Sequence, residues 1–203
     1  MVGGLPVPWV AQWSQESAQA LRRPRIEQRP GPDGELVQTL VADNERRDRF
    51  GILWMAMSHR PGRGEPRFAE LHPDRQRESM DRGLCQVCST RIRPPVTFLA
   101  PSEWAYETLG GRRDRISTLH APVCSGCASV SAQRCPHLRG EAFLFVAAQT
   151  VTPCAVVGDV YDLHSGEVTR RNMICRHDEP ASRLLVARQR IAELEAWEPI
   201  EIP

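Results

Sequence analysis

The sequence contains no lysine, and all 26 of its basic residues are arginine. This absence excludes catalysis by a Schiff-base or general-base lysine. We attribute it to a GC-rich genome, which favours Arg, Ala, Pro and Gly codons, rather than to a need for guanidinium groups. No apolar run approaches the roughly 18 residues that cross a bilayer, and the first residues lack the features of a signal peptide. We therefore expect a cytoplasmic protein with no membrane association.

Tyrosine is also scarce, with two residues, whereas proline occurs 17 times. The 203 residues, 41% hydrophobic and 25% charged, are typical of a soluble globular protein with many loops. The net charge of +1 hides an uneven distribution, because residues 85–140 carry seven arginines and three acidic residues, while residues 141–203 carry six and ten. This balance is well short of that of a dedicated nucleic-acid-binding domain.

Four of the seven cysteines form two C-x2-C pairs, Cys85 with Cys88 and Cys124 with Cys127, and 35 residues separate the pairs. Each such turn can place two sulfurs about 2.3 Å from one ion, and two turns complete a tetrahedron. Disulfides are a poor alternative, because an odd number of cysteines leaves one unpaired. We predict one structural Zn²⁺ held by these four thiolates, a closed shell with no position for water or substrate.

The segments around the two pairs suggest a treble-clef-like arrangement of knuckle, hairpin and helix. Strand candidates occupy residues 96–100 and 116–123, between the pairs, and residues 128–134 contain no Gly or Pro and can form a helix. A helix that begins at the second pair would stabilise its thiolates through the helix dipole.

The remaining cysteines and histidines carry weaker signals. Their residue types would suit a second metal site, or a nucleophilic pair formed by Cys175 and His177. However, the spacing of these residues in the sequence matches no known motif of either kind. The second metal site would be formed by Cys135, His137, Cys175 and His177, whereas Cys154 lies in an apolar strand segment. We expect these cysteines to be buried core thiols, and His120 to be an imidazole either of the core or beside the metal ligands.

We divide the chain into an extended N-terminal arm (1–34), a hairpin plus short helix (35–84), the zinc-binding module (85–140), and strands with a C-terminal helix (141–203). In the second region, residues 35–41 and 50–57 are expected to pair, and residues 72–81 form a helix with Pro73 at its first position. Trp9 and Trp13 of the arm should pack on the body rather than stack on nucleobases.

Beyond the zinc module, residues 141–149, 154–163 and 167–175 are predicted strands. Leu184, Ala187, Ile191 and Leu194 recur every three or four positions, which predicts a helix from Pro180 to Trp197 that docks on the sheet or pairs with a second copy in a dimer. The expected fold class is α+β, with small antiparallel sheet elements around the zinc module and a C-terminal helix.

Arginines in and just before the zinc module form a candidate surface for nucleic acid. A solvated helix face is the commoner explanation for those near residue 75. Binding through this surface would be weak and sensitive to salt. The candidate contacts are Arg75, Arg77, Arg91, Arg93, Arg112, Arg113 and Arg115.

Several short sequence motifs resemble those of a group of uncharacterised actinobacterial proteins common in Streptomyces. They are Trp13-Ser-Gln-Glu16, the helix His72–Met80 leading to Leu84-Cys-Gln-Val-Cys88, and Pro122-Val-Cys-Ser-Gly-Cys127 with Cys135-Pro-His-Leu138. The resemblance spans the larger part of the chain and implies a cytoplasmic zinc-binding protein without an established activity.

The knuckle also resembles the metal frame of HNH endonucleases. Those enzymes need a general-base histidine on the first strand, and an Asn and a His beside the catalytic metal. Between the cysteine pairs this sequence has only His120, and neither Asn nor His falls in residues 128–134. The resemblance therefore implies at most a degenerate relative without metal-dependent nuclease activity.

Two function classes remain open. The first is a zinc-stabilised binding or regulatory protein that contacts nucleic acid or a protein partner through the arginines or the C-terminal helix. The second is an enzyme of unrecognised type that uses His120, His137, Cys175 or His177. The closed metal shell and the lack of a catalytic motif favour the first class.

Overall fold

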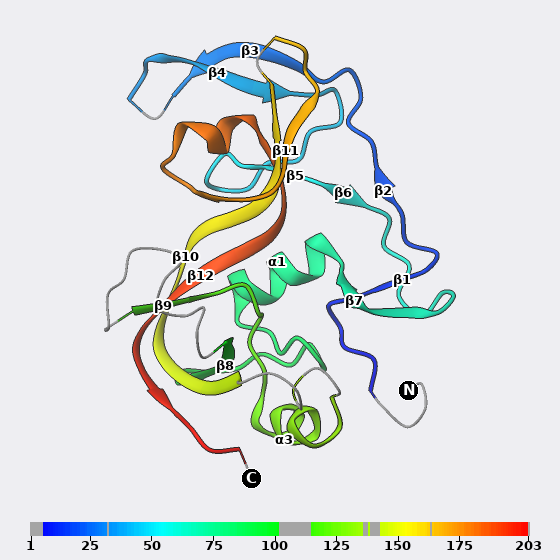
Figure 1. The fold of residues 1–203 in the computed structure, drawn as a ribbon, viewed down its shortest axis with the longest axis vertical. Helices are drawn as coiled ribbons and strands as arrows, with labels where there is room; N and C mark the ends of the chain where they lie inside the picture. The colour runs from blue at the N-terminus through cyan, green and yellow to red at the C-terminus, as the bar shows by residue number, and fades with distance from the viewer. Residues whose placement is uncertain are drawn as a thin grey trace.

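Two long antiparallel strands form the centre of the fold. The structure is a computed structural model that describes residues 6–31, 33–101, 115–135, 138, 143–162 and 164–202. These strands, β10 (Phe143–Tyr161) and β12 (Leu185–Pro199), run along the long axis of the molecule (Figure 1). They pair from Val146↔Pro199 to Val160↔Leu185.

Different strands flank the two halves of this central pair and complete a six-stranded sheet. At one end, β11 (Val168–Arg176) pairs with β10, and β5 (Leu53–Trp54) runs parallel to β12. At the other end, β8 (Val96–Pro101) pairs with β10, and β9 (Arg115–Thr118) pairs with β12. The strands expected between residues 141 and 175 are therefore confirmed over their described residues, and the first two merge into β10.

The predicted α+β fold class is wrong, because the structure is mostly β, with 47% strand and 15% helix. The C-terminal helix is the main error, since residues 180–184 form a short 3₁₀ turn, η1 (Pro180–Leu184), and the rest is β12. Thirteen residues of β10 pair with β12, and this ladder overrides the helical propensity of Ala, Leu, Glu and Arg. Since this helix is not formed, the suggested dimerisation through it has no structural basis.

Two α-helices occur in the described part of the chain, α1 (Pro73–Arg82) and α3 (Ser125–Arg134). Helix α1 begins with Pro73 at its first position, as predicted, and ends at Gly83, whose φ of 64° favours glycine. It packs against β12, where Met80 joins Phe98, Ile116 and Leu194 in the largest buried apolar cluster. None of the described helices is long and apolar enough to span a membrane.

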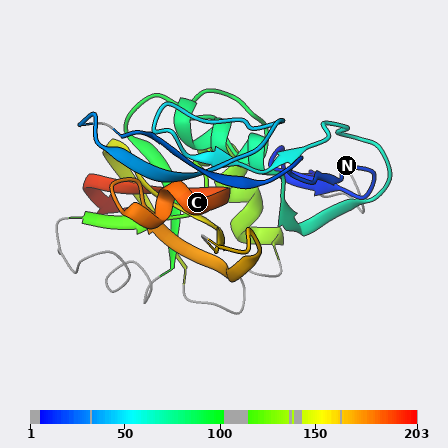
Figure 2. The ribbon, with the colours of Figure 1, turned by 90° about the horizontal axis from the view of Figure 1, so that it is seen from above.

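The N-terminal regions form three small two-stranded sheets. The strands are β1 (Ala11–Trp13) with β7 (Pro66–Leu71), β2 (Ala18–Gln19) with β6 (Ala56–Met57), and β3 (Arg25–Pro30) with β4 (Leu36–Val41). The predicted hairpin of residues 35–41 with 50–57 is wrong, because β4 pairs with β3 inside the presumed N-terminal arm, while residues 50–57 divide between β5 and β6. In the view along the long axis, the β1–β7 pair lies to one side of the central sheet (Figure 2).

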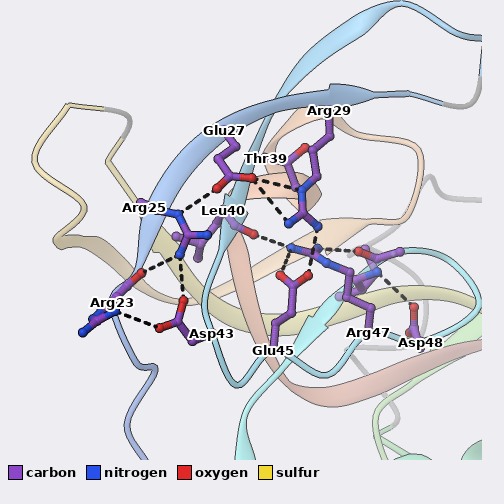
Figure 3. Close-up of polar contacts among 12 residues, drawn as sticks. Arg23, Arg25, Glu27, Arg29, Thr39, Leu40, Asp43, Glu45, Arg47 and Asp48 are labelled. Atoms are coloured by element: carbon purple, nitrogen blue, oxygen red, sulfur yellow. Dashed lines mark hydrogen bonds and ion pairs between the residues drawn. The ribbon is translucent and has the colours of Figure 1, made fainter.

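Alternating arginines and carboxylates link the β3–β4 hairpin to the loop after β4 (Figure 3). Arg25 contacts Glu27 at 2.7 Å and Asp43 at 3.0 Å. Arg29 contacts Glu45 at 2.9 Å, and the same carboxylate contacts Arg47 at 2.9 Å. Since these groups are partly exposed to solvent, each pair contributes little to stability, but the network pairs these arginines within the chain.

Candidate metal centre

The first cysteine pair lies in a tight knuckle directly after α1. The Cys85 amide donates to the Thr90 carbonyl at 2.8 Å, and the Ser89 amide donates to the Cys85 carbonyl at 2.8 Å. These bonds close a turn that brings Cys85, which is fully buried, and Cys88, which is exposed, to the same side. A C-x2-C turn of this kind directs both sulfurs toward one point.

The second cysteine pair lies at the start of α3, as the sequence predicts. Cys124 is the N-cap residue and Cys127 lies in the first helical turn. The Cys124 amide also donates to Sγ of Cys85 at 3.4 Å, which joins the helix start to the knuckle. Helix N-termini favour anionic ligands such as thiolates.

All four sulfur atoms lie within 4.8 Å of one another, an arrangement that fits a metal ion. Sγ of Cys88 and Sγ of Cys124 are 3.8 Å apart, far longer than a disulfide bond of about 2.05 Å. The predicted ligand set Cys85, Cys88, Cys124 and Cys127 is therefore brought together by the fold.

The hairpin of the expected treble clef does not form in the described residues. Strands β8 and β9, which lie between the cysteine pairs, pair with β10 and β12 respectively and not with each other. The knuckle and α3 therefore rest on the end of the large sheet. A small apolar cluster, in which Val123 and Ala128 are buried against Val87, Ile92 and Phe145, anchors them there.

Burial and neighbouring groups shift the pKa values of Cys85, Cys88 and Cys127. Burial raises the pKa of Cys85. Burial also opposes ionisation of Cys88, but the Thr90 hydroxyl at 3.4 Å and the Thr90 amide lower the pKa of Cys88 to about 6. Burial and the neighbouring Cys124 thiol raise the pKa of Cys127 well above its usual value. A cation among these sulfurs would favour the thiolate form of each.

Arg75 is not available to nucleic acid. Its side chain is 1% exposed, and two guanidinium nitrogens each donate to an oxygen of Glu16 at 2.7 Å. The guanidinium also lies 5.5 Å from the ring centre of Trp9, which packs on the body as expected. This arginine is a buried structural group, and its candidate role as a surface contact is wrong.

Two other candidate arginines are also engaged within the chain. Arg77 contacts Asp74 at 3.0 Å and lies over the Trp54 ring, and Arg115 contacts Glu193 at 2.7 Å and Glu195 at 3.0 Å. Arg91 and Arg93 are exposed beside the knuckle. Arg112 and Arg113 lie outside the described residues. Among the described candidates, Arg91 and Arg93 are therefore the exposed ones, while Arg77 and Arg115 are partly exposed and paired with carboxylates.

Cys175 and His177 do not form a nucleophilic pair. The Cys175 thiol faces Glu179 Oε2 at 3.3 Å, and burial together with this carboxylate raises the pKa of Cys175 to about 12. His177 Nε2 instead lies 3.0 Å from Arg190, and burial together with Arg190 lowers the pKa of His177 to about 4. The thiol is therefore protonated, and its surroundings resist the formation of a nucleophile.

The other weak candidates also remain separate. Cys154 is partly buried beside the Ile191 carbonyl, and burial raises its pKa to about 11. Cys135 caps the C-terminus of α3 and is partly buried. His137 lies outside the described residues, so the second metal site suggested by ligand type has no described geometry.

The fold brings together one further cluster that the sequence does not reveal, because its members are far apart in the chain. Ligand atoms of Glu16, His59 and His72 lie within 4.8 Å of one another. However, the Glu16 carboxylate already accepts bonds from the Trp13 and Arg60 amides and pairs with Arg75. A cation there would displace these donors and meet the guanidinium charge, so we do not assign a metal to this cluster.

No protein family, no curated protein and no solved structure matches this chain. The resemblance to actinobacterial zinc proteins and to HNH endonucleases therefore stays a prediction from the sequence.

Proposed function

We propose that this chain is a zinc-stabilised binding protein of the cytoplasm, in which the ion has a structural role. The observation that carries the proposal is the four-sulfur cluster. In a tetrahedron with Zn–S bonds of about 2.3 Å the sulfurs lie about 3.8 Å apart, and Sγ of Cys88 and Sγ of Cys124 are separated by 3.8 Å. All four sulfurs lie within 4.8 Å of one another, and four thiolates around one ion form a closed shell.

Two further features support a non-catalytic role. Four protein ligands leave no coordination position for water or substrate. The candidate nucleophile Cys175 is buried with a raised pKa, and its potential base His177 faces Arg190. The proposal of nucleic-acid contact now depends, among the described candidates, on Arg91 and Arg93, which are too few for more than weak and salt-sensitive binding.

The test is metal analysis of the purified protein and of matched cysteine variants. We expect one zinc per chain, and we expect Cys88→Ser to lose it together with much of the folding free energy, since structural zinc contributes on the order of 10 kcal/mol. Cys154→Ala removes a thiol outside the cluster and should keep the full metal content. Full zinc and unchanged stability in Cys88→Ser would contradict the assignment.

A further inference from the structure

A pocket of about 460 Å³ lies between the N-terminal segment, β7, the metal module and the end of the large sheet. Its floor includes Leu99 of β8 and Phe145 of β10, which are direct cross-strand neighbours. Gln86 and Val87 of the cysteine knuckle form one wall, and Ser131 of α3 forms another part of the lining. A volume of this size lies within the range of about 300–1,000 Å³ that is typical of small-molecule sites.

Backbone hydrogen bonds hold the walls of the pocket in place. The amides of Trp9 and Val10 donate to the carbonyls of Val87 and Gln86 at 3.0 and 3.1 Å, which fastens the N-terminal segment to the knuckle. The Gln86 amide in turn donates to the Pro122 carbonyl at 2.7 Å. Because regular backbone bonds join these segments, the pocket is formed before any ligand arrives.

The described part of the lining carries no formal charge. Of its 17 described residues, 12 are apolar, five are Gln, Ser, Cys or His, and none is Arg, Asp or Glu. In a chain with 25% charged residues, a lining of this size would contain about four charged side chains by chance. Phe68, which is 43% exposed, adds an apolar ring to the same site. An ionised ligand would lose its hydration here without gaining a counter-charge.

We propose that this pocket binds a small, uncharged and mainly apolar molecule, which the glutamine, serine and histidine side chains orient by hydrogen bonds. The inference goes beyond the proposed zinc site: the knuckle and α3 contribute to both, but none of the four cysteines of the cluster lines the pocket. Ligand binding and metal content are therefore measured separately.

The experiment is a titration of the full chain with the neutral fluorescent probe N-phenyl-1-naphthylamine, followed by displacement. We expect saturable binding that 1-decanol reverses and decanoate does not, because the two competitors share one chain and differ in charge. Ser131→Phe should fill the pocket and weaken probe binding roughly tenfold, which corresponds to about 1.4 kcal/mol. Val130→Phe, on the exposed side of the same helix, should bind the probe like the unmodified protein.

A second variant covers the case in which Ser131→Phe does not fold. Phe68→Glu changes a partly exposed position and places a carboxylate at the pocket, so it should also weaken binding of the neutral probe. If protein with its full zinc content does not bind the probe, the proposed ligand pocket is overturned and the zinc assignment is unaffected. If protein that never holds zinc binds the probe, the zinc assignment is overturned and the pocket proposal is unaffected. Equal affinity in Phe68→Glu and Val130→Phe, or equal displacement by decanoate and decanol, also overturns the proposal.

Discussion

Replacing Glu16 with glutamine should destabilise the fold strongly, although the two side chains have nearly the same shape. The Glu16 side chain is fully buried and forms two bonds of 2.7 Å with Arg75, which is buried as well. Burial opposes ionisation of this carboxyl, but Arg75 and the Trp13 and Arg60 amides lower its pKa from 4.5 to about 2. Since a tenfold change in an ionisation constant is worth about 1.4 kcal/mol, the charge stabilises the fold by about 3 kcal/mol at neutral pH.

The pH dependence gives the prediction its sign. The pKa of Glu16 is lower in the folded chain, so the stabilisation is fully present above pH 4.5 and is lost as the pH falls toward 2. The difference in free energy of unfolding between the unmodified protein and Glu16→Gln should thus be about 3 kcal/mol at pH 7 and roughly half of that at pH 3. Comparing the two proteins at each pH cancels proton effects on the metal site, which both share.

The assay is urea denaturation followed by tryptophan fluorescence, with Glu70→Gln as the matched control. Glu70 is 50% exposed and pairs with Arg67 on the surface, so its replacement should change stability by less than about 0.5 kcal/mol. A loss below about 1 kcal/mol in Glu16→Gln at pH 7, or a loss that stays constant down to pH 3, would refute the reasoning.

Two further predictions concern the long sheet and the core beside it. Gly158→Ala should destabilise the fold by more than about 2 kcal/mol in thermal denaturation, because the added Cβ would lie 2.3 Å from a carbonyl oxygen of β12, whereas Gly126→Ala, in open space on α3, should be neutral or stabilising. Asp48→Asn should lower the free energy of unfolding by about 2–4 kcal/mol in urea denaturation, because the Asp48 carboxylate contacts the fully buried Arg190 at 2.7 Å. Asp178→Asn, at an exposed position, is the control. Equal stability of the two asparagine variants would contradict a stabilising role of the buried pair.

The four-cysteine cluster is the part of the molecule that the sequence predicts best. Each C-x2-C pair is local, because four consecutive residues hold both sulfurs and their turn, and a helix-competent segment follows Cys124 directly. Helix α1 is predictable for the same reason, since Pro73 and Gly83 mark its ends within one short stretch. The sequence also reveals that two pairs with this spacing suit one ion.

Tertiary structure alone decided the secondary structure of residues 185–199 and the role of Arg75. The spacing of Leu184, Ala187, Ile191 and Leu194 suits a helix, but β10 offers thirteen pairing partners, from Val160↔Leu185 to Val146↔Pro199, that no local pattern reveals. Likewise, the sequence around Arg75 is typical of a surface helix, but the folded chain buries Arg75 against Glu16, which lies 59 positions earlier. Local patterns determine the elements whose hydrogen bonds close within a few residues, whereas a strand or a buried charge depends on a partner that only the folded chain supplies.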